Sequence, residues 1–130
     1  MTATHKLGDV YDPSCSARDV LGLIASKWAM LILPALDGGP MRNGALLRRI
    51  GGISQKMLTQ TLRELERNGV VIRRDMGSVP PHVEYRLSPL GASLSKALVG
   101  LNRWAERHFS AVDAARERWD RATHQRRAGG

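Results

Sequence analysis

The side chains best suited to chemistry lie between residues 54 and 69, where polar and cationic groups recur at helical spacing. On one face of such a helix stand Gln55, Lys56, Thr59, Gln60 and Arg63. Amides, hydroxyls and cationic groups bond to base edges and phosphates in a major groove. No carboxylate joins them before Glu64, whereas an ordinary solvated helix mixes both charge signs along a face. The pattern therefore predicts a helix that reads DNA.

A single thiol is the second candidate for chemistry. Because Cys15 is the one cysteine, the chain has no intrachain disulfide and no cysteine-rich zinc site. Its position at a predicted helix start, with Arg18 one turn on, favours a lowered thiol pKa. Two interpretations stay open: a sensor that forms an intersubunit bridge, a mixed disulfide or an alkylated product, or a small structural residue. The histidines show no metal-ligand spacing, so we expect no metal and no cofactor.

The candidate reading helix carries its own start and stop signals. Ser54 can cap the first backbone N–H groups, and Gly69 supplies the left-handed residue that ends a helix. Ile53 and Leu58 are spaced for a hydrophobic staple. An apolar stripe at spacings of four and three is formed by Leu58, Leu62 and Leu65. These signals predict a helix that buries one face and presents the other.

Three shorter helices are predicted before it. Apolar spacing indicates one from about residue 15 to 25, and Ser26 caps a second, which Pro34 should kink or end early. Trp28 in that helix is either core or the lining of a ligand pocket. A third helix, from about 43 to 50, turns Arg48 and Arg49 outward, and Gly51-Gly52 makes a tight turn into the reading helix. This succession has the spacing of a helix-turn-helix.

After Gly69 the apolar period changes from 3.6 to 2, which predicts two strands, at about 70–72 and 83–87. The residues between them are too rich in Gly and Pro for regular structure. Two strands around a loop behind a reading helix form a wing, suited to phosphate or minor-groove contacts. The basic side chains placed there are Arg73, Arg74, His82 and Arg86.

A last helix begins at Ser88-Pro89 and keeps its apolar stripe for about 25 residues, to about Val112. That length exceeds what so small a domain needs to cover its own core, so we expect burial against a second subunit. The alternative is a helix that packs only on its own domain. The predicted interface residues are Leu94, Leu98, Leu101, Trp104 and Phe109.

The size and charge of the chain indicate which kinds of partner the protein can bind. The 130 residues carry 20 Lys and Arg against 12 Asp and Glu, a net charge of +8 that favours a polyanionic partner. No run of about 18 apolar residues or apolar leader is present, so we expect a cytoplasmic protein with no membrane partner.

We divide the chain into a flexible arm (1–14), a winged helix-turn-helix domain with a dimerisation helix (15–112) and a fraying basic tail (113–130).

Several separated motifs resemble those of the HxlR-type winged helix-turn-helix regulators, a MarR-related family. The matching segments are 15–16, 24–28, 52–59, 62–71 and 79–91, in a resemblance that spans about residues 15–109. It implies a mainly α fold with a small β-wing, a homodimer built largely by the terminal helices, and a two-fold symmetric operator. Several relatives sense oxidants or electrophiles with an N-terminal cysteine at the position of Cys15. Departures are Pro34, the stretch 43–46, and His82 where a wing arginine is common, which predicts stronger wing affinity below neutral pH.

Three functional classes remain. The leading one is a sequence-specific, double-stranded-DNA-binding transcriptional regulator, a homodimeric repressor with a small electrophile, oxidant or aromatic effector. The alternative is a winged-helix module for protein or RNA contact without sequence-specific DNA binding. An enzyme is the third class, and no predicted geometry places a histidine and an orienting group beside Cys15. We therefore expect no enzymatic activity.

Overall fold

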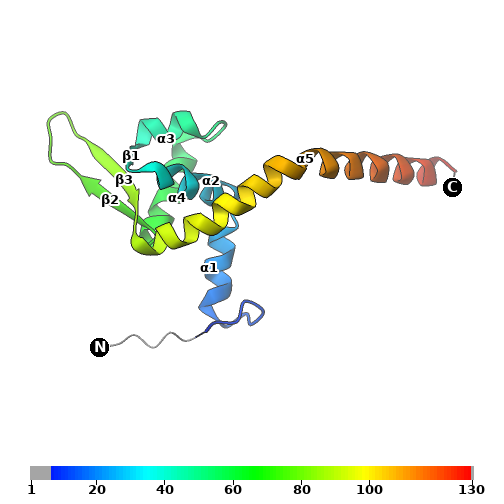
Figure 1. The fold of residues 1–130 in the computed structure, drawn as a ribbon, viewed down its shortest axis with the longest axis horizontal. Coiled ribbons are helices and arrows are strands. Elements are labelled where there is room, and N and C mark those ends of the chain that lie inside the picture. Colours follow the sequence, from blue (N-terminus) through cyan, green and yellow to red (C-terminus); the bar gives the residue numbers. More distant parts are fainter. Residues whose placement is uncertain (1–6, 130) are drawn as a thin grey trace.

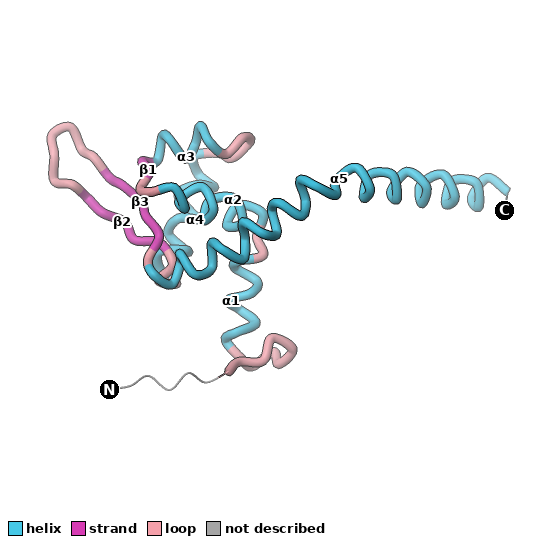
Figure 2. Tube along the Cα trace, viewed as in Figure 1, coloured by secondary structure: helices cyan, strands magenta, loops and turns pink. Residues whose placement is uncertain are grey.

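The computed structural model describes residues 7–129 and shows a helical head with two projecting helices (Figure 1, Figure 2). The predicted mainly α fold with a small β-wing is confirmed. The elements are α1 (Ser16–Ile24), α2 (Lys27–Ala35), a 3₁₀ turn (Leu36–Gly38), β1 (Met41–Arg42), α3 (Asn43–Arg49), α4 (Gln55–Arg67), β2 (Val71–Asp75), β3 (Val83–Leu87) and α5 (Pro89–Gly129). The predicted flexible arm, 1–14, falls partly on residues 1–6, outside the described residues.

The reading helix forms where its local signals predicted it. The Ser54 hydroxyl accepts a hydrogen bond from the Met57 amide at 3.0 Å, so the first turn is capped. At the other end Gly69 takes a φ of +76°, the left-handed conformation that glycine adopts without strain. The apolar stripe is buried throughout, at Leu58, Leu62 and Leu65. Local sequence therefore fixes both the length and the orientation of α4.

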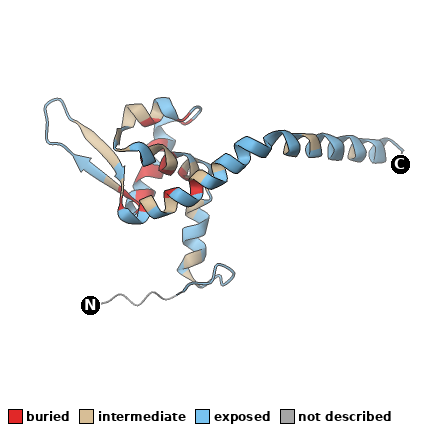
Figure 3. Ribbon diagram, in the orientation of Figure 1, coloured by how far each residue is buried: buried red, intermediate tan, exposed pale blue. Residues whose placement is uncertain are grey.

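Helix α2 is the centre of the core (Figure 3). The hydroxyl of Ser26 caps it as predicted, accepting from the Ala29 amide at 3.3 Å. Pro34 lies inside α2, and the α-helix passes at Leu36 into a 3₁₀ turn that ends at Gly38, so Pro34 does not by itself stop the helical turns. Around it pack the buried core residues Ala29, Ile32, Leu33, Leu36, Leu46, Ile50, Ile53, Leu58, Leu62, Leu65, Val70, Val71 and Leu98. Trp28 is half-buried against this cluster.

The wing is a three-stranded antiparallel sheet in the order β1-β3-β2. The sequence predicted only two strands, and β1 was missed because two residues give no periodic signal. The strand is defined by pairing with residues distant in the sequence, since Met41 pairs with Tyr85 and Arg42 with Glu84. This pairing ties the segment before α3 to the returning strand of the wing, so α3 and the wing are held in one unit.

Helix α5 is longer than predicted. It runs for 41 residues, about 60 Å at 1.5 Å per residue, and the expected end at Val112 with a fraying tail is wrong. No glycine or proline interrupts the helix between Gly100 and Gly129, so backbone hydrogen bonding continues through the basic residues. Its first turns pack on α2, and its distal half projects away from the head (Figure 1).

A tight junction joins α4 to α5. The Ser88 hydroxyl donates to the Gly69 carbonyl oxygen at 2.6 Å and accepts from the Gly91 amide at 3.0 Å. A Cβ on Gly91 would lie 1.9 Å from the Val70 carbonyl oxygen, so only glycine allows this approach. The segment at the end of α4 and the first turn of α5 are therefore in direct contact.

No single helix within residues 7–129 has both the length and the apolar content needed to cross a membrane. One bent pair, Ser16–Ile24 with Lys27–Gly38 at 75°, meets the criterion by length and composition. Within that pair Ala29, Ile32 and Leu33 of α2 belong to the core of the head.

Candidate nucleic-acid interface

The predicted reading face of α4 is exposed along its length. The turn before it contains Gly52 at a φ of +84°, which reverses the chain so that α3 and α4 meet as a helix-turn-helix. Because the apolar stripe of α4 points into the core, the opposite face points outward. That face holds the exposed Gln55, Lys56, Gln60 and Arg63 and the half-buried Thr59, as the sequence predicted.

Two hydrogen bonds order the first turns of α4. The Gln55 side-chain amide donates to the Thr59 hydroxyl at 3.0 Å, so these two polar groups form one unit on the exposed face. Beneath them the buried Thr61 hydroxyl donates to the Met57 carbonyl oxygen at 2.7 Å. The first pair offers a hydrogen-bonding group of fixed orientation, which is what recognition of a base edge requires.

The cationic groups of this face are not neutralised within the head. Within residues 7–129 the ion pair on α4 joins Arg67 to Glu64 at 3.8 Å, on the last turns of the helix. Lys56 and Arg63 take part in no ion pair there. Their charge therefore remains for phosphate or guanine.

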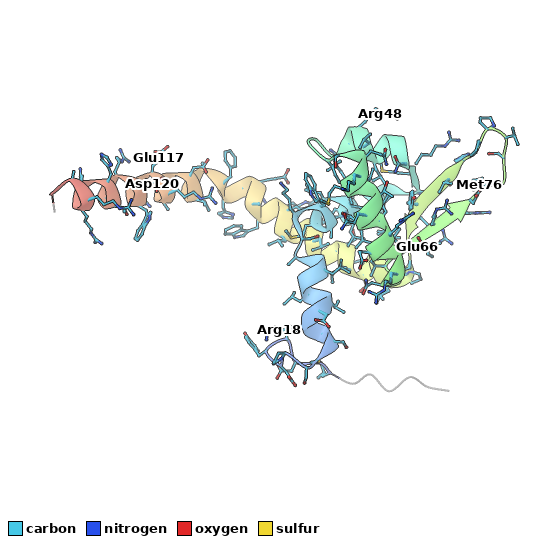
Figure 4. All side chains as sticks on the ribbon, turned by 180° about the vertical axis from the view of Figure 1, so that it is seen from behind. Arg18, Arg48, Glu66, Met76, Glu117 and Asp120 are labelled. Atoms are coloured by element: carbon cyan, nitrogen blue, oxygen red, sulfur yellow. The ribbon has the colours of Figure 1, made fainter. Side chains whose placement is uncertain are left out.

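Helix α3 contributes basic groups beside the turn. Arg48 and Arg49 are exposed in its last turn, as predicted. Figure 4 shows Arg48 on α3 at the head, far from Glu117 and Asp120 on the distal part of α5. Arg49 also lines a hollow of about 510 Å³ between α2, α3 and α5, with Arg103 and Glu106 on its α5 side.

The wing divides its basic residues between two faces. Residues paired across antiparallel strands share a face, so Arg74 (opposite Glu84) and Arg86 (opposite Ile72) lie together on the face away from the core. Arg73 pairs with Tyr85, whose face packs against the core, although the arginine itself is exposed. The sequence placed these arginines correctly on the wing but could not separate the faces without the strand register.

His82 lies in a hydrogen-bonded cluster at the base of the wing. It is half-buried, its Nδ1 accepts a hydrogen bond from the Arg42 guanidinium, and its Nε2 donates to Glu84 Oε1 at 3.0 Å. The imidazole therefore links Arg42 of β1 to Glu84 of β3, and a phosphate contact by His82 stays a prediction. Arg42 could not be identified from the sequence, because its partner His82 is 40 residues away.

Cys15 lies at the start of α1, away from the reading face. It is half-buried, and Gly8 is so close that an added Cβ would lie 3.3 Å from the sulfur. The Asp9 amide, 3.4 Å from Sγ, lowers the thiol pKa most, and the Ala17 amide adds to this, while burial and Asp19 oppose it. The predicted direction is confirmed but not the predicted cationic cause. Arg18 is not among the groups that shift the pKa.

The predicted subunit-interface residues divide into two groups. Leu98 is buried in the core of its own domain and Leu94 is half-buried against it, so Leu98 cannot serve as an exposed contact. Half or more of the surface of Leu101, Trp104 and Phe109 is exposed. The sequence missed Trp119, which is 66% exposed, because its segment was expected to fray. The Trp104 ring stacks on His108 at 4.9 Å.

Comparisons with known proteins agree with this geometry. The model of the HxlR-like helix-turn-helix family matches residues 23–113. The HTH-type transcriptional regulator YtfH of Escherichia coli (strain K12) is 43% identical over 112 residues, 86% of this chain and 89% of that protein. The solved transcriptional regulator ytfH from Salmonella typhimurium is 42% identical with a TM-score of 0.80, over 85% of this chain and 99% of that one.

A third comparison is with a protein named as a redox regulator. The redox regulator HypR in its oxidised form is 34% identical with a TM-score of 0.67, over 72% of this chain and 96% of that one. These proteins are transcriptional regulators, not enzymes, and the family match covers most of the chain. The chain therefore belongs to the HxlR-like helix-turn-helix family of transcriptional regulators.

Proposed function

We propose that the protein is a homodimeric repressor that reads a two-fold symmetric DNA site with α4. The observation that supports this most is the exposed face of α4, where hydrogen-bonding and cationic groups stand ahead of the first carboxylate, Glu64. Exposed arginines on α3 and the wing flank that face, and the net charge of +8 adds attraction to phosphate. Side chains of α4 would read base edges, and Arg48, Arg49, Arg73, Arg74 and Arg86 would hold the backbone.

The dimer is inferred from the apolar side chains that α5 leaves exposed. Leu101, Trp104 and Phe109 are large, and a charged helix surface in water does not ordinarily carry them so close together. Pairing of α5 with a second copy would bury them. The two α4 helices would then meet half-sites about 34 Å apart, one turn of DNA. A dimer bound across a promoter would block it, and for that reason we propose repression.

Cys15 is proposed as the sensing residue. Its lowered pKa raises the fraction of thiolate, which is the form that attacks oxidants and electrophiles. The likeness to HypR, named a redox regulator, supports this choice. With one thiol per chain, diamide would oxidise two thiols from two molecules to a disulfide, and it would take up both electrons and both protons.

Retention of genomic duplex fragments by the purified protein, with and without diamide, tests these proposals. We expect a small set of fragments with inverted repeats, and loss of retention after diamide in the wild type but not in Cys15→Ser. Retention of all sequences alike, with steep salt dependence, would instead favour the polyanion-binding module. Retention by the wild type that diamide leaves unchanged would remove Cys15 as the sensor and leave the DNA proposal intact.

A further inference from the structure

The wing has the support of a third strand only at its base. Strand β1 ends at Arg42, which pairs with Glu84, so the sheet has two strands beyond this pair. The Met76 amide closes this two-stranded part by donating to the His82 carbonyl oxygen at 2.8 Å. The loop that follows projects from the head (Figure 1, Figure 2). Because a two-stranded ribbon is only marginally stable by itself, the position of the wing depends on what holds its base.

Three side chains extend that support beyond the end of β1. The Arg42 guanidinium donates to Nδ1 of His82, and Nε2 of His82 donates to Glu84 Oε1 at 3.0 Å. Since an arginine can only donate, Nδ1 is the acceptor and Nε2 carries the proton of the imidazole. His82 and Glu84 are both half-buried, which partly shields these bonds from water. We call Arg42, His82 and Glu84 the wing clamp.

Arg42 also belongs to the helix-turn-helix. It is the N-cap residue of α3, so β1 passes into α3 at this residue. Arg48 and Arg49 lie in the last turn of the same short helix, and Arg86 lies on the strand at the other end of the clamp. The clamp therefore holds the two groups of proposed phosphate contacts, on α3 and on the wing, at one separation.

The clamp also determines where the Glu84 carboxylate points. Glu84 pairs with Arg42 on one side and with Arg74 on the other, in a row across the sheet. Opposite charges at paired positions of neighbouring strands attract each other. Glu84 nevertheless bonds to His82, and Arg74 takes part in no ion pair within residues 7–129. The charge of Arg74 thus stays available for phosphate.

We propose that His82 is a positioning residue for DNA binding, which acts through Arg74 and Arg86 and contacts no DNA itself. It holds the wing at a fixed angle to α3, and it keeps the Glu84 carboxylate away from Arg74. The proposal rests on the proposed contact of the wing with DNA and adds the group on which that contact depends. It competes with a direct phosphate contact by His82, for which the imidazole would have to be a cation.

Two substitutions of His82 separate its hydrogen bonds from its possible charge. His82→Leu removes both bonds of the imidazole, whereas His82→Gln retains an acceptor and a donor but cannot become a cation. We expect His82→Leu to weaken binding to a fluorescent mixed-sequence duplex about tenfold at neutral pH, as for the loss of a bond to a charged group. His82→Gln should retain most of the wild-type affinity. Anisotropy titrations measure the affinities, and thermal unfolding checks that each variant is folded. Equal losses for the two variants, or none for His82→Leu, would overturn the proposal.

A double-mutant cycle tests whether His82 acts through the wing arginines. In the Arg74→Ala, Arg86→Ala background, His82→Leu should have little further effect, because no arginine of that face is left to position. A tenfold loss that persists in this background would assign His82 a direct contact or a general structural role, and it would contradict positioning. If Arg74→Ala, Arg86→Ala binds as tightly as the wild type, the wing contact itself fails and the positioning role fails with it. Reading by α4 would still stand.

The other end of the clamp is tested with Arg42→Met, which keeps the aliphatic stem and removes the donors. We expect the same loss of affinity as for His82→Leu, and no larger loss when the two are combined, because both break the same chain of bonds. Arg48→Met is the matched control on α3. Its loss should add to that of His82→Leu, since Arg48 lies outside the clamp. Additive losses for Arg42→Met and His82→Leu would assign Arg42 to phosphate and contradict the clamp.

Discussion

The head of the molecule and its two projecting helices use their side chains in opposite ways. In the head, α4 buries Leu58, Leu62 and Leu65 and exposes amides, hydroxyls and cations. On α5, beyond the first turns, large apolar groups such as Trp104 and Trp119 are exposed, and α1 buries no residue at all. The head thus buries most of its large apolar side chains within one chain, whereas the projecting helices leave theirs exposed.

This contrast distinguishes two kinds of partner. A well-packed apolar core with an exposed polar and basic face suits a hydrated polyanion. Binding to such a partner comes from hydrogen bonds and from counterion release. An exposed apolar stripe suits a protein surface, because its gain comes from burial. The Ser88–Gly91 junction joins the two regions through close backbone contacts.

The largest expected effect is a loss of stability, which should be much greater for a change in the buried stripe of α4 than for one in the exposed stripe of α5. Leu65→Ala should lower the free energy of unfolding by about 2–5 kcal/mol, because it leaves a cavity in a fully buried site. Phe109→Ala should lower it far less at dilutions where the chain is monomeric. Urea denaturation measures both, and equal losses for the two variants would contradict the contrast.

A second effect concerns the junction. Gly91→Ala should cost about 1–3 kcal/mol of unfolding free energy, because its Cβ would collide with the Val70 carbonyl oxygen. Gly100→Ala is the matched control, since an added Cβ there meets no atom within 4 Å. Thermal unfolding compares the pair. A Gly91→Ala variant as stable as Gly100→Ala would show that the two helices are not tightly joined.

A third effect tests the basic face of the wing. Arg74→Ala with Arg86→Ala should weaken binding to all duplexes alike and reduce the slope of log affinity against log salt by about two, if each contacts one phosphate. Arg121→Ala on the exposed part of α5 is the control and should leave the slope unchanged. Titrations at several salt concentrations give the slope. A loss confined to one base position would assign the two arginines to base reading instead.

The smallest effect concerns the thiol at the start of α1. Because the Asp9 amide lowers the pKa of Cys15, alkylation by iodoacetamide should begin at lower pH than for an unstructured cysteine. Asp9→Pro removes that N–H and should move the profile to higher pH. Asp9→Ala retains the amide and should leave the profile closer to that of the wild type. Identical profiles for the two variants would show that another group controls the thiol.

Much of the head could be predicted from sequence because its signals are local. Ser54, Gly69 and the Leu58-Leu62-Leu65 stripe lie within 16 residues, and they fixed both ends and the orientation of α4. The same holds for Ser26 and Ser88, whose hydroxyls cap the helices that follow them. A cap or a stripe depends only on neighbours a few residues away, so it can be read without the fold.

The features that could not be predicted depend on distant partners. Strand β1 exists because Met41 pairs with Tyr85, and His82 is bound because Arg42 and Glu84 flank it. Leu98 and Leu101 look alike in sequence, yet Leu98 is 5% and Leu101 50% exposed. Which of two leucines three residues apart faces the core depends on the angle at which α5 leaves the junction, and no local pattern gives that angle.

The central claim is that the exposed face of α4 chooses the DNA sequence. The most direct measurement compares wild type with Gln60→Ala, Arg63→Ala on duplexes selected from a random pool, with Arg126→Ala, Arg127→Ala near the end of α5 as control. Each lost base contact should cost about 1–3 kcal/mol and relax the preference at the positions it reads, symmetrically in both half-sites. The control should keep the wild-type preference. A doubly substituted α4 that selects the same sequence with the same affinity would contradict the account.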